Sequence, residues 1–271
     1  MLDAASEMIE SSGLTVSLDH ISFEEVIQRA GVSRSAAYRR WPYKDLFFTD
    51  LLRELARASR PTTAYALAGS PAAVARLALA HLGEAATPDG RRDLVLELIR
   101  RAGLGEFEIT SRSPEWRTYL ALHATFLSVA DEGLRGELEA SLGASERGFI
   151  GSVAASWEAV SKLFGYRLRP ELGATFEDLA SLLVVTLRGL VIMAPSTPEL
   201  GARRIRGAPF GTAEEKEWSL PALLMASIAF TFLEPDANMV WNEERAREAQ
   251  STFDRLASTG DGDGSGTELE P

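Results

Sequence analysis

Apolar residues recur with the spacing of an α-helix along almost the whole chain. Amphipathic segments that follow the i, i+3, i+4, i+7 rule are marked by Leu2, Ala5 and Ile9; by Phe48, Leu51, Leu52 and Leu55; by Val95, Leu98, Ile99 and Ala102; and by Ile150, Val153, Trp157, Val160 and Phe164. No segment alternates convincingly between apolar and polar residues, as a half-buried strand does. The pattern predicts an all-α fold whose first helix ends at Gly13 and whose helix around Leu51 runs to about Ser59.

Two late segments, residues 179–194 and 222–233, are apolar around most of the helical circumference. A helix of this kind must be covered on more than one side. One interpretation is a central helix within a single chain. The other, which two such segments favour, is that a second copy of the chain covers them, so we predict a homodimer through helices near 179–194 and 213–233.

Proline and glycine divide the remainder of the chain. Residues 195–211 are rich in Pro, Gly and Arg and are expected to form a long loop. Thr212 and Glu215 then have the spacing of a capping box that restarts a helix, which Pro221 is expected to kink. Prolines at 61 and 71 indicate a boundary. The predicted organisation is therefore a domain at 1–59, a larger helical domain at 60–258 and a disordered acidic tail at 259–271.

The composition is that of an ordinary globular protein. The chain has 271 residues, 45% hydrophobic and 25% charged, and no cysteine, which excludes disulfides and thiolate metal sites. The first ten residues show no secretion signal, and Arg188 interrupts the longest apolar run, so we expect a cytoplasmic protein without a membrane span. His20, His81 and His123 are far apart, and neither a metal nor another cofactor is expected.

Residues 22–45 have the pattern of two short helices joined by a tight turn. Ser22 is a favourable N-cap for the first helix, and Gly31 allows a backbone turn that a β-carbon would disfavour. Ser33 caps a second helix, which runs to about Trp41 and is stopped by Pro42. In a helix-turn-helix, the second of two such helices enters the major groove of DNA.

Charge supports this interpretation locally, although the whole chain carries a net charge of −11. Residues 29–44 contain five cations and no Asp or Glu, which gives a local charge of +5. On the second helix, Ala37 and Trp41 share an inward face, whereas small and basic side chains face outward. Such side chains can approach base edges or phosphates. The alternative is a solvated, cationic helical hairpin that has no partner.

The stretch from Leu2 to Leu55 resembles the N-terminal domain of the TetR family of transcriptional regulators. The resemblance lies in LDAASEMIESSG and in AGVSRSAAYRRWPYKDLF. It implies an all-helical homodimer whose larger C-terminal domain binds a small-molecule effector and dimerises. By position, the residues expected to contact DNA are Ser22, Ser33, Arg34, Ser35, Ala36, Tyr38, Arg39, Arg40 and Lys44. Arg39 and Arg40 replace His or Tyr residues that are more usual there, which makes this surface more cationic.

A helix predicted after Ser113, a favourable N-cap followed by Pro114, carries several large side chains. With residues of two other helices they could line an apolar pocket with a few polar groups, the usual form of a small-molecule site. The predicted effector-binding residues are Trp116, Tyr119, His123, Phe126, Trp157 and Met193. The alternative is that these side chains are simply part of the core.

Taken together, these patterns indicate a ligand-responsive transcriptional regulator. We expect a repressor that binds a palindromic operator in double-stranded DNA as a homodimer and is released by a small-molecule effector. An alternative is a helical carrier or enzyme with a non-functional DNA-binding motif. The sequence contains no nucleophile–His–acid arrangement and no phosphate-binding glycine loop, so we expect no enzymatic activity.

Overall fold

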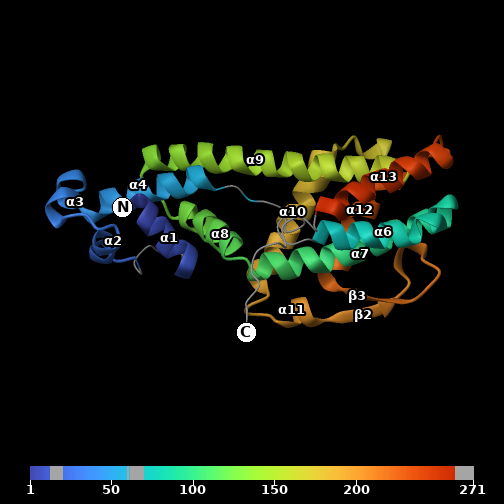
Figure 1. Ribbon diagram of the computed structural model, residues 1–271, viewed down its shortest axis with the longest axis horizontal. Helices are drawn as coiled ribbons and strands as arrows, with labels where there is room; N and C mark the ends of the chain where they lie inside the picture. Colours follow the sequence, from blue (N-terminus) through green and yellow to red (C-terminus); the bar gives the residue numbers. More distant parts are fainter. Residues whose placement is uncertain (13–20, 60, 62–69, 260–271) are drawn as a thin grey trace, which may run out of the picture. The chain divides into compact units, whose positions relative to one another are not determined.

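The computed structural model describes residues 1–12, 21–59, 61 and 70–259, and it is predominantly helical, as predicted (Figure 1). The chain divides into two compact units. The first unit contains Met1–Pro61 and Ser111–Phe149, and the second contains Thr62–Thr110 and Ile150–Pro271. The predicted tail lies outside the described residues from position 260 onward, and so does the predicted helix stop at Gly13.

The first unit is built from helices. Its elements are α1 (Leu2–Ser12), α2 (Phe23–Arg29), α3 (Arg34–Arg40), α4 (Lys44–Ala58), α8 (Pro114–Leu127) and the first part of α9 (Glu132–Leu163). Helix α8 packs against both α1 and α4. The predicted end of α4 is confirmed, because Ser59 is its C-cap.

The core of the first unit forms where the predicted apolar stripes meet. Ile9 of α1, Val26 of α2 and Leu51 of α4 have no exposed surface. Phe47 is also completely buried and contacts the rings of Phe23, Trp41 and Phe48, with centroids 5.0–5.6 Å apart. Helices as short as α2 and α3 gain their stability from such contacts rather than from intrinsic helix propensity.

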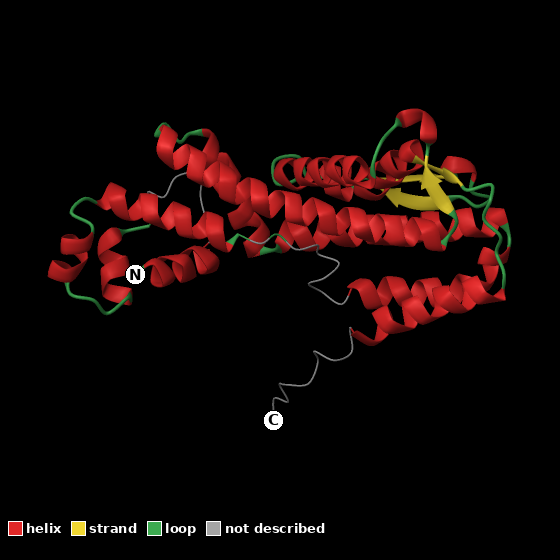
Figure 2. Cartoon of the chain, turned by 90° about the horizontal axis from the view of Figure 1, so that it is seen from above, coloured by secondary structure: helices red, strands yellow, loops and turns green. Residues whose placement is uncertain are grey.

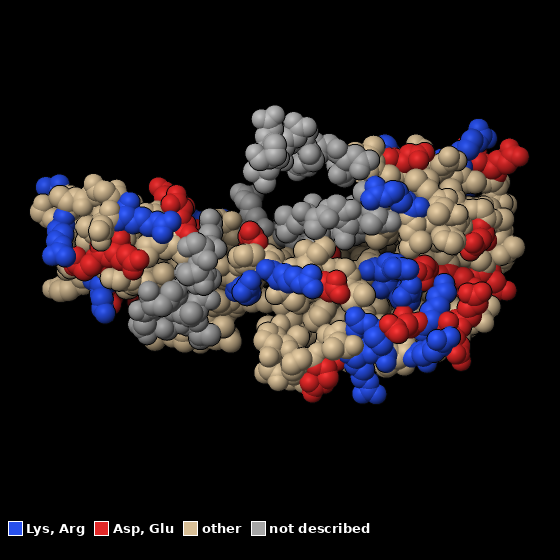
Figure 3. All heavy atoms as spheres, turned by 60° about the horizontal axis from the view of Figure 1, so that its bottom comes forward, with Lys and Arg blue, Asp and Glu red and all other residues tan. Residues whose placement is uncertain are grey.

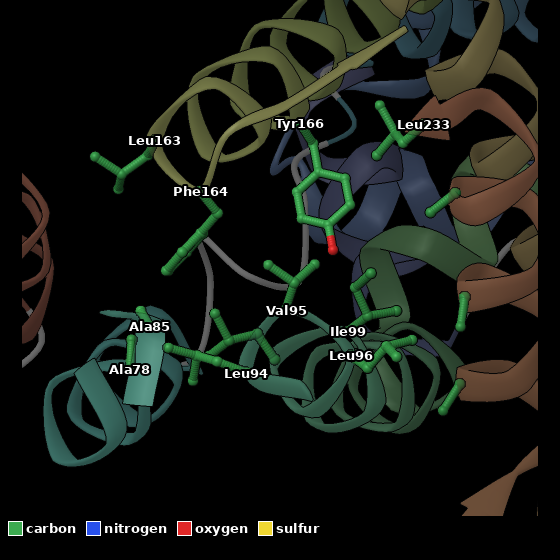
Figure 4. Packing of buried hydrophobic residues seen from close by; sticks show 14 of the residues in the cluster. Ala78, Ala85, Leu94, Val95, Leu96, Ile99, Leu163, Phe164, Tyr166 and Leu233 are labelled. Carbon is green, nitrogen blue, oxygen red and sulfur yellow. The ribbon is translucent and has the colours of Figure 1, made fainter. Parts of the chain in front are cut away.

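The second unit combines helices with short strands. Its elements are α6 (Ser70–His81), η2 (Leu82–Ala86), α7 (Pro88–Arg112), the rest of α9, β1 (Tyr166–Leu168), η3 (Pro170–Leu172), α10 (Phe176–Met193), α11 (Glu199–Ala202), β2 (Arg204–Gly207), η4 (Pro209–Gly211), β3 (Lys216–Ser219), α12 (Leu220–Phe232), β4 (Leu233–Pro235) and α13 (Glu243–Thr259). Helix α6 packs against α13, and α10 packs against α12. In the core, Phe164 and Tyr166 point towards Leu94, Val95 and Ile99 of α7 (Figure 4).

The prediction that the chain has no strands is wrong in this unit, as Figure 2 shows. Strand β1 pairs with β4, and β2 pairs with β3, both antiparallel. Each ladder is only three or four residues long, which is too short for a two-residue alternation to stand out in the sequence. The partners of the first ladder also lie far apart in the chain, so local propensity carries no record of their pairing.

The predicted loop at 195–211 and the helix restart at Thr212 are also corrected. The predicted loop contains α11, β2 and η4. Residues 216–219, which the sequence predicts to be helical, form β3, so α12 begins only at Leu220. Ser219 is the N-cap of α12 and accepts a hydrogen bond from the backbone N–H of Ala222 (3.3 Å). Pro221 lies in the first turn of the helix, where backbone N–H groups have no carbonyl acceptor within the helix. The lack of an N–H therefore costs no hydrogen bond, and Pro221 favours the start of the helix instead of kinking it. The predicted apolar segment near 213–233 is therefore helical only from Leu220 to Phe232.

Helix α10 has the apolar character that the sequence predicts, and Thr175 and Asp178 form a capping box at its start. One face is buried through Leu179, Leu183 and Val191. In the described part of the chain, neither α10 nor any other helix is both long and apolar enough to cross a membrane.

Candidate nucleic-acid interface

Both ends of α2 and the turn that follows it are determined by local hydrogen bonds. Ser22 caps α2 as predicted, with its hydroxyl 3.4 Å from the backbone N–H of Glu25. Gly31 has a left-handed φ of 64°. Its N–H donates a hydrogen bond to the carbonyl of Gln28 (3.1 Å), and the N–H of Val32 donates one to the carbonyl of Ile27 (3.3 Å). This pair of bonds is a Schellman motif, which ends a helix and reverses the chain at a residue that glycine suits best.

Helix α3 has nearly the predicted bounds. The hydroxyl of Ser33 accepts a hydrogen bond from the backbone N–H of Ala36 (3.2 Å), which is the expected N-cap. The helix ends at Arg40, Trp41 is the C-cap, and Pro42 follows. Sequence alone thus identifies both ends of the second short helix to within one residue.

Two residues anchor α3 to the first unit. Ala37 is buried, as predicted, with 2% of its surface exposed. Trp41 is half-buried, lies edge-on to Phe47 and donates its indole N–H to an Asp50 carboxylate oxygen (3.0 Å). Because this bond and the nearby Arg53 guanidinium favour the ionised carboxylate, they lower the pKa of Asp50 despite its partial burial.

The other side of α3 faces solvent. Of the predicted DNA-contacting residues, Ala36 is half-buried and the other eight are exposed. The exposed residues are Ser22, Ser33, Arg34, Ser35, Tyr38, Arg39, Arg40 and Lys44. We call the seven from Ser33 to Lys44 together with Ala36 the α3 face. Figure 3 shows basic side chains at the left-hand end, where Figure 1 places α3, with acidic side chains beside them.

The acidic neighbours of the α3 face are Glu24 and Asp50. Glu24 of α2 accepts a hydrogen bond from the Tyr38 hydroxyl (2.7 Å) and forms an ion pair with Arg34 (2.8 Å). Arg40 lies over the Trp41 ring, 5.4 Å from its centroid, and is 3.8 Å from Asp50. The local charge of +5 does not include these carboxylates, because both lie outside the acid-free window at 29–44.

The remaining cations of the α3 face have no acidic partner among the residues that the structure describes. Within the described residues, Arg39 and Lys44 form no ion pair or side-chain hydrogen bond. Lys44 opens α4, where exposed backbone N–H groups and the helix dipole favour an anion. The predicted local charge of +5 is thus partly neutralised at Arg34 and Arg40, and it stays available at Arg39 and Lys44.

Four predicted effector residues lie on α8 of the first unit. Trp116 and Tyr119 are buried, each 4% exposed, and Tyr119 lies edge-on to both Trp116 and His123. The Tyr119 hydroxyl donates to a Glu146 carboxylate oxygen on α9 (2.5 Å). Phe126 is half-buried, with the Arg135 guanidinium 5.6 Å from its ring centroid. These contacts hold α8 against the first part of α9.

The other two predicted effector residues belong to the second unit. Trp157 packs against the core of that unit, and Met193 at the end of α10 is 52% exposed. The six residues therefore do not form one cluster within either unit. Two shallow hollows of the second unit lie along α13, one of them beside Leu79, Leu82 and Trp241, and no predicted effector residue lines either.

Comparisons with known proteins do not assign the chain. No protein-family model matches it, no curated protein matches it and no solved structure matches it. In the described parts of the chain, no group of three or more His, Asp or Glu side chains is placed to hold a metal ion.

Proposed function

We propose that this chain is a DNA-binding transcriptional regulator, similar in organisation to the TetR family, whose α3 helix enters the major groove. The observation that carries the proposal is the construction of α3. It is capped at Ser33, is anchored by Ala37 and Trp41, and presents its remaining polar and cationic side chains to solvent. A short, positioned helix with an exposed polar face is what a major-groove reading element requires.

The residues of the α3 face suit different parts of a DNA duplex. Ser35 and Ala36 are small and allow the helix to approach base edges closely, and Arg34 reaches either a guanine edge or a phosphate. Tyr38, Arg39 and Arg40 suit backbone phosphates. Lys44, at the start of α4, and Ser22, before α2, are placed at helix N-termini, which also favour phosphate.

Dimerisation through α10 completes the proposal. Four large apolar side chains of this helix are exposed, and they are Leu182 (47%), Val185 (63%), Ile192 (59%) and Met193 (52%). Their spacing places them along one helix face, which we call the α10 stripe. A second copy of the chain would cover this stripe through a two-fold interface, and a two-fold dimer reads a palindromic operator.

In this proposal the protein is a repressor that a small-molecule effector releases from DNA. An effector that binds one dimer conformation more tightly shifts the population towards it, and the spacing of the two α3 helices then ceases to match the operator. The aromatic residues of α8 stay candidates for an effector contact. An effector that loosens the Tyr119–Glu146 contact would alter the packing of α8 against α9.

The decisive experiment measures fluorescence anisotropy of the full chain with labelled DNA from its own upstream region, using scrambled DNA as competitor. We expect competitor-resistant binding that weakens as salt rises. Lys44→Ala should reduce affinity and lower the slope of log affinity against log salt by about 0.9. Arg57→Ala, which removes an exposed cation near the other end of α4, is the matched control.

Two results would contradict the proposal. One is equal, weak binding to both DNAs in every variant, which would leave only a cationic hairpin. The other is an equal effect of Lys44→Ala and Arg57→Ala, which would show that DNA does not approach through the α3 face.

A further inference from the structure

Glu24 bridges two residues of the α3 face with its two carboxylate oxygens. Oε2 lies 2.8 Å from Nη2 of Arg34, and Oε1 accepts the hydroxyl hydrogen of Tyr38 at 2.7 Å. Arg34 and Tyr38 are four residues apart, so they project from the same side of α3. A guanidinium and a hydroxyl thus converge on one oxyanion from two successive turns of the helix.

The same pair of donors suits a DNA phosphate. A phosphate presents two unesterified oxygens, as a carboxylate does, and Arg and Tyr side chains are common phosphate partners. The site is also prearranged, because the Tyr38 ring lies edge-on to buried Phe23, with centroids 5.4 Å apart. This contact restrains the ring that carries the hydroxyl. Arg34, whose side chain is 75% exposed, can follow an incoming anion at little cost.

We infer that Arg34 and Tyr38 form a single phosphate subsite, and that the Glu24 carboxylate occupies this subsite until a DNA phosphate displaces it. The inference rests on the proposed function. It gives Glu24 a regulatory role, because every DNA sequence offers phosphates and all must compete with the same internal anion. Glu24 thereby weakens sequence-independent binding, and stable complexes form only where base contacts add to the phosphate contacts.

Two properties of the bridge agree with such an exchange. The Glu24 side chain is 44% exposed, so water can solvate the carboxylate when it swings away. The hydrogen bond to the Glu24 carboxylate raises the pKa of Tyr38, because this bond favours the protonated hydroxyl that donates it.

The opposite role is that Glu24 supports DNA binding by holding Arg34 and Tyr38 in place. The two roles predict opposite effects of Glu24→Gln, which preserves the shape of the side chain and removes its charge. Glu25→Gln is the matched control, because Glu25 lies in the same turn of α2, is exposed, and its carboxylate has no described partner.

The experiment measures binding of the full chain to a labelled duplex of random sequence over a range of salt concentrations. We expect Glu24→Gln to bind about three- to tenfold more tightly than Glu25→Gln, which is the effect of releasing one exposed ion pair and one charge-assisted hydrogen bond. The slope of log affinity against log salt should also steepen by up to about 0.9, because one more phosphate is contacted.

The outcomes separate this inference from the proposed function. If Lys44→Ala weakens binding while Glu24→Gln binds no better than Glu25→Gln, the α3 face binds DNA and the phosphate exchange is wrong. If no variant binds DNA, both proposals fail. A titration of the Tyr38 ring by NMR without DNA tests the bridge itself. Glu24→Gln should lower the pKa of Tyr38 towards its usual value, and an unchanged pKa would overturn the bridge.

Discussion

The proposed DNA-reading helices of the first unit and the strands of the second unit depend on contacts of different sequence range. In the first unit, Ser22, Gly31 and Ser33 fix the ends of α2 and α3 through bonds to residues only a few positions away. In the second unit, β1 pairs with β4, and the β2–β3 pair separates α11 from α12. Local signals therefore explain the proposed DNA-reading element, whereas the β1–β4 pair of the second unit joins segments that are far apart in the chain and meet only when it folds.

The charged groups show the same difference. Asp50 of α4 accepts hydrogen bonds from Arg53, one turn further along the same helix, and from Trp41, which lies just before that helix begins. Glu97 of α7 instead bonds to Arg100 and Arg101 of its own helix and to Lys216 of β3. Burial would raise the pKa of Glu97, but these cations outweigh it and hold the pKa at about 2. One carboxylate supports a local element, and the other joins elements that are far apart in sequence.

The largest expected effect comes from removing the aromatic residue that α2, α3 and α4 share. Phe47→Ala should lower the free energy of unfolding by about 3–5 kcal/mol, because a completely buried ring is replaced by a cavity. Urea denaturation followed by circular dichroism measures this change. Leu46→Ala, at a neighbouring position that is 48% exposed, is the control and should change stability by less than about 0.5 kcal/mol. Equal effects would show that α2 and α3 do not depend on this core.

The next effect concerns the α10 stripe. If a second copy covers it, Val185→Glu buries a charge in an apolar interface and should weaken the dimer by at least about a hundredfold. Sedimentation at low protein concentration should then shift from twice 29.4 kDa to 29.4 kDa. Leu172→Glu, at another exposed leucine in η3, should leave the mass unchanged. A wild-type chain that sediments as a monomer would remove the proposed interface.

An intermediate effect is expected at Glu97, and it depends on pH. Its pKa in the folded chain is about 2, below the ordinary value of 4.5, so its stabilisation is present above pH 4.5 and is lost as the pH falls through about 2. Glu97→Gln should cost about 3 kcal/mol at neutral pH, and the cost should shrink steadily below pH 4.5. Glu217→Gln on β3, whose side chain is 70% exposed, is the control. A cost that is independent of pH would show that charge is not its cause.

The smallest effect is expected at a cap of α3. Ser33→Ala removes the acceptor for the Ala36 N–H and should destabilise the first unit by about 1 kcal/mol. Arg39→Ala, at an exposed position of the same helix whose side chain has no described partner, should have little effect on stability. Thermal denaturation of both variants checks the difference, and identical melting curves would remove Ser33 as a structural cap.

The proposed DNA interface was largely predictable from its residues, apart from its electrostatics. The caps at Ser22 and Ser33, the turn at Gly31 and the burial of Ala37 all follow from neighbouring residues. The bridge from Glu24 to Arg34 and Tyr38 does not follow from neighbouring residues, because it spans two helices and depends on how they cross. Similarly, no signal in the sequence indicates that Trp116 and Met193 belong to different units.

By itself, the sequence determined the helical class of this protein, the ends of α2, α3 and α4, and the exposed polar surface of α3. Each of these depends on the periodicity of apolar residues or on a capping bond between near neighbours. Only the tertiary structure decided the two strand pairs, including the strand β3 that precedes α12, the bonds of Glu24 to α3 and the bond of Glu97 to Lys216. These contacts involve partners on different elements, so their energy appears only when the chain has folded and brings those elements together.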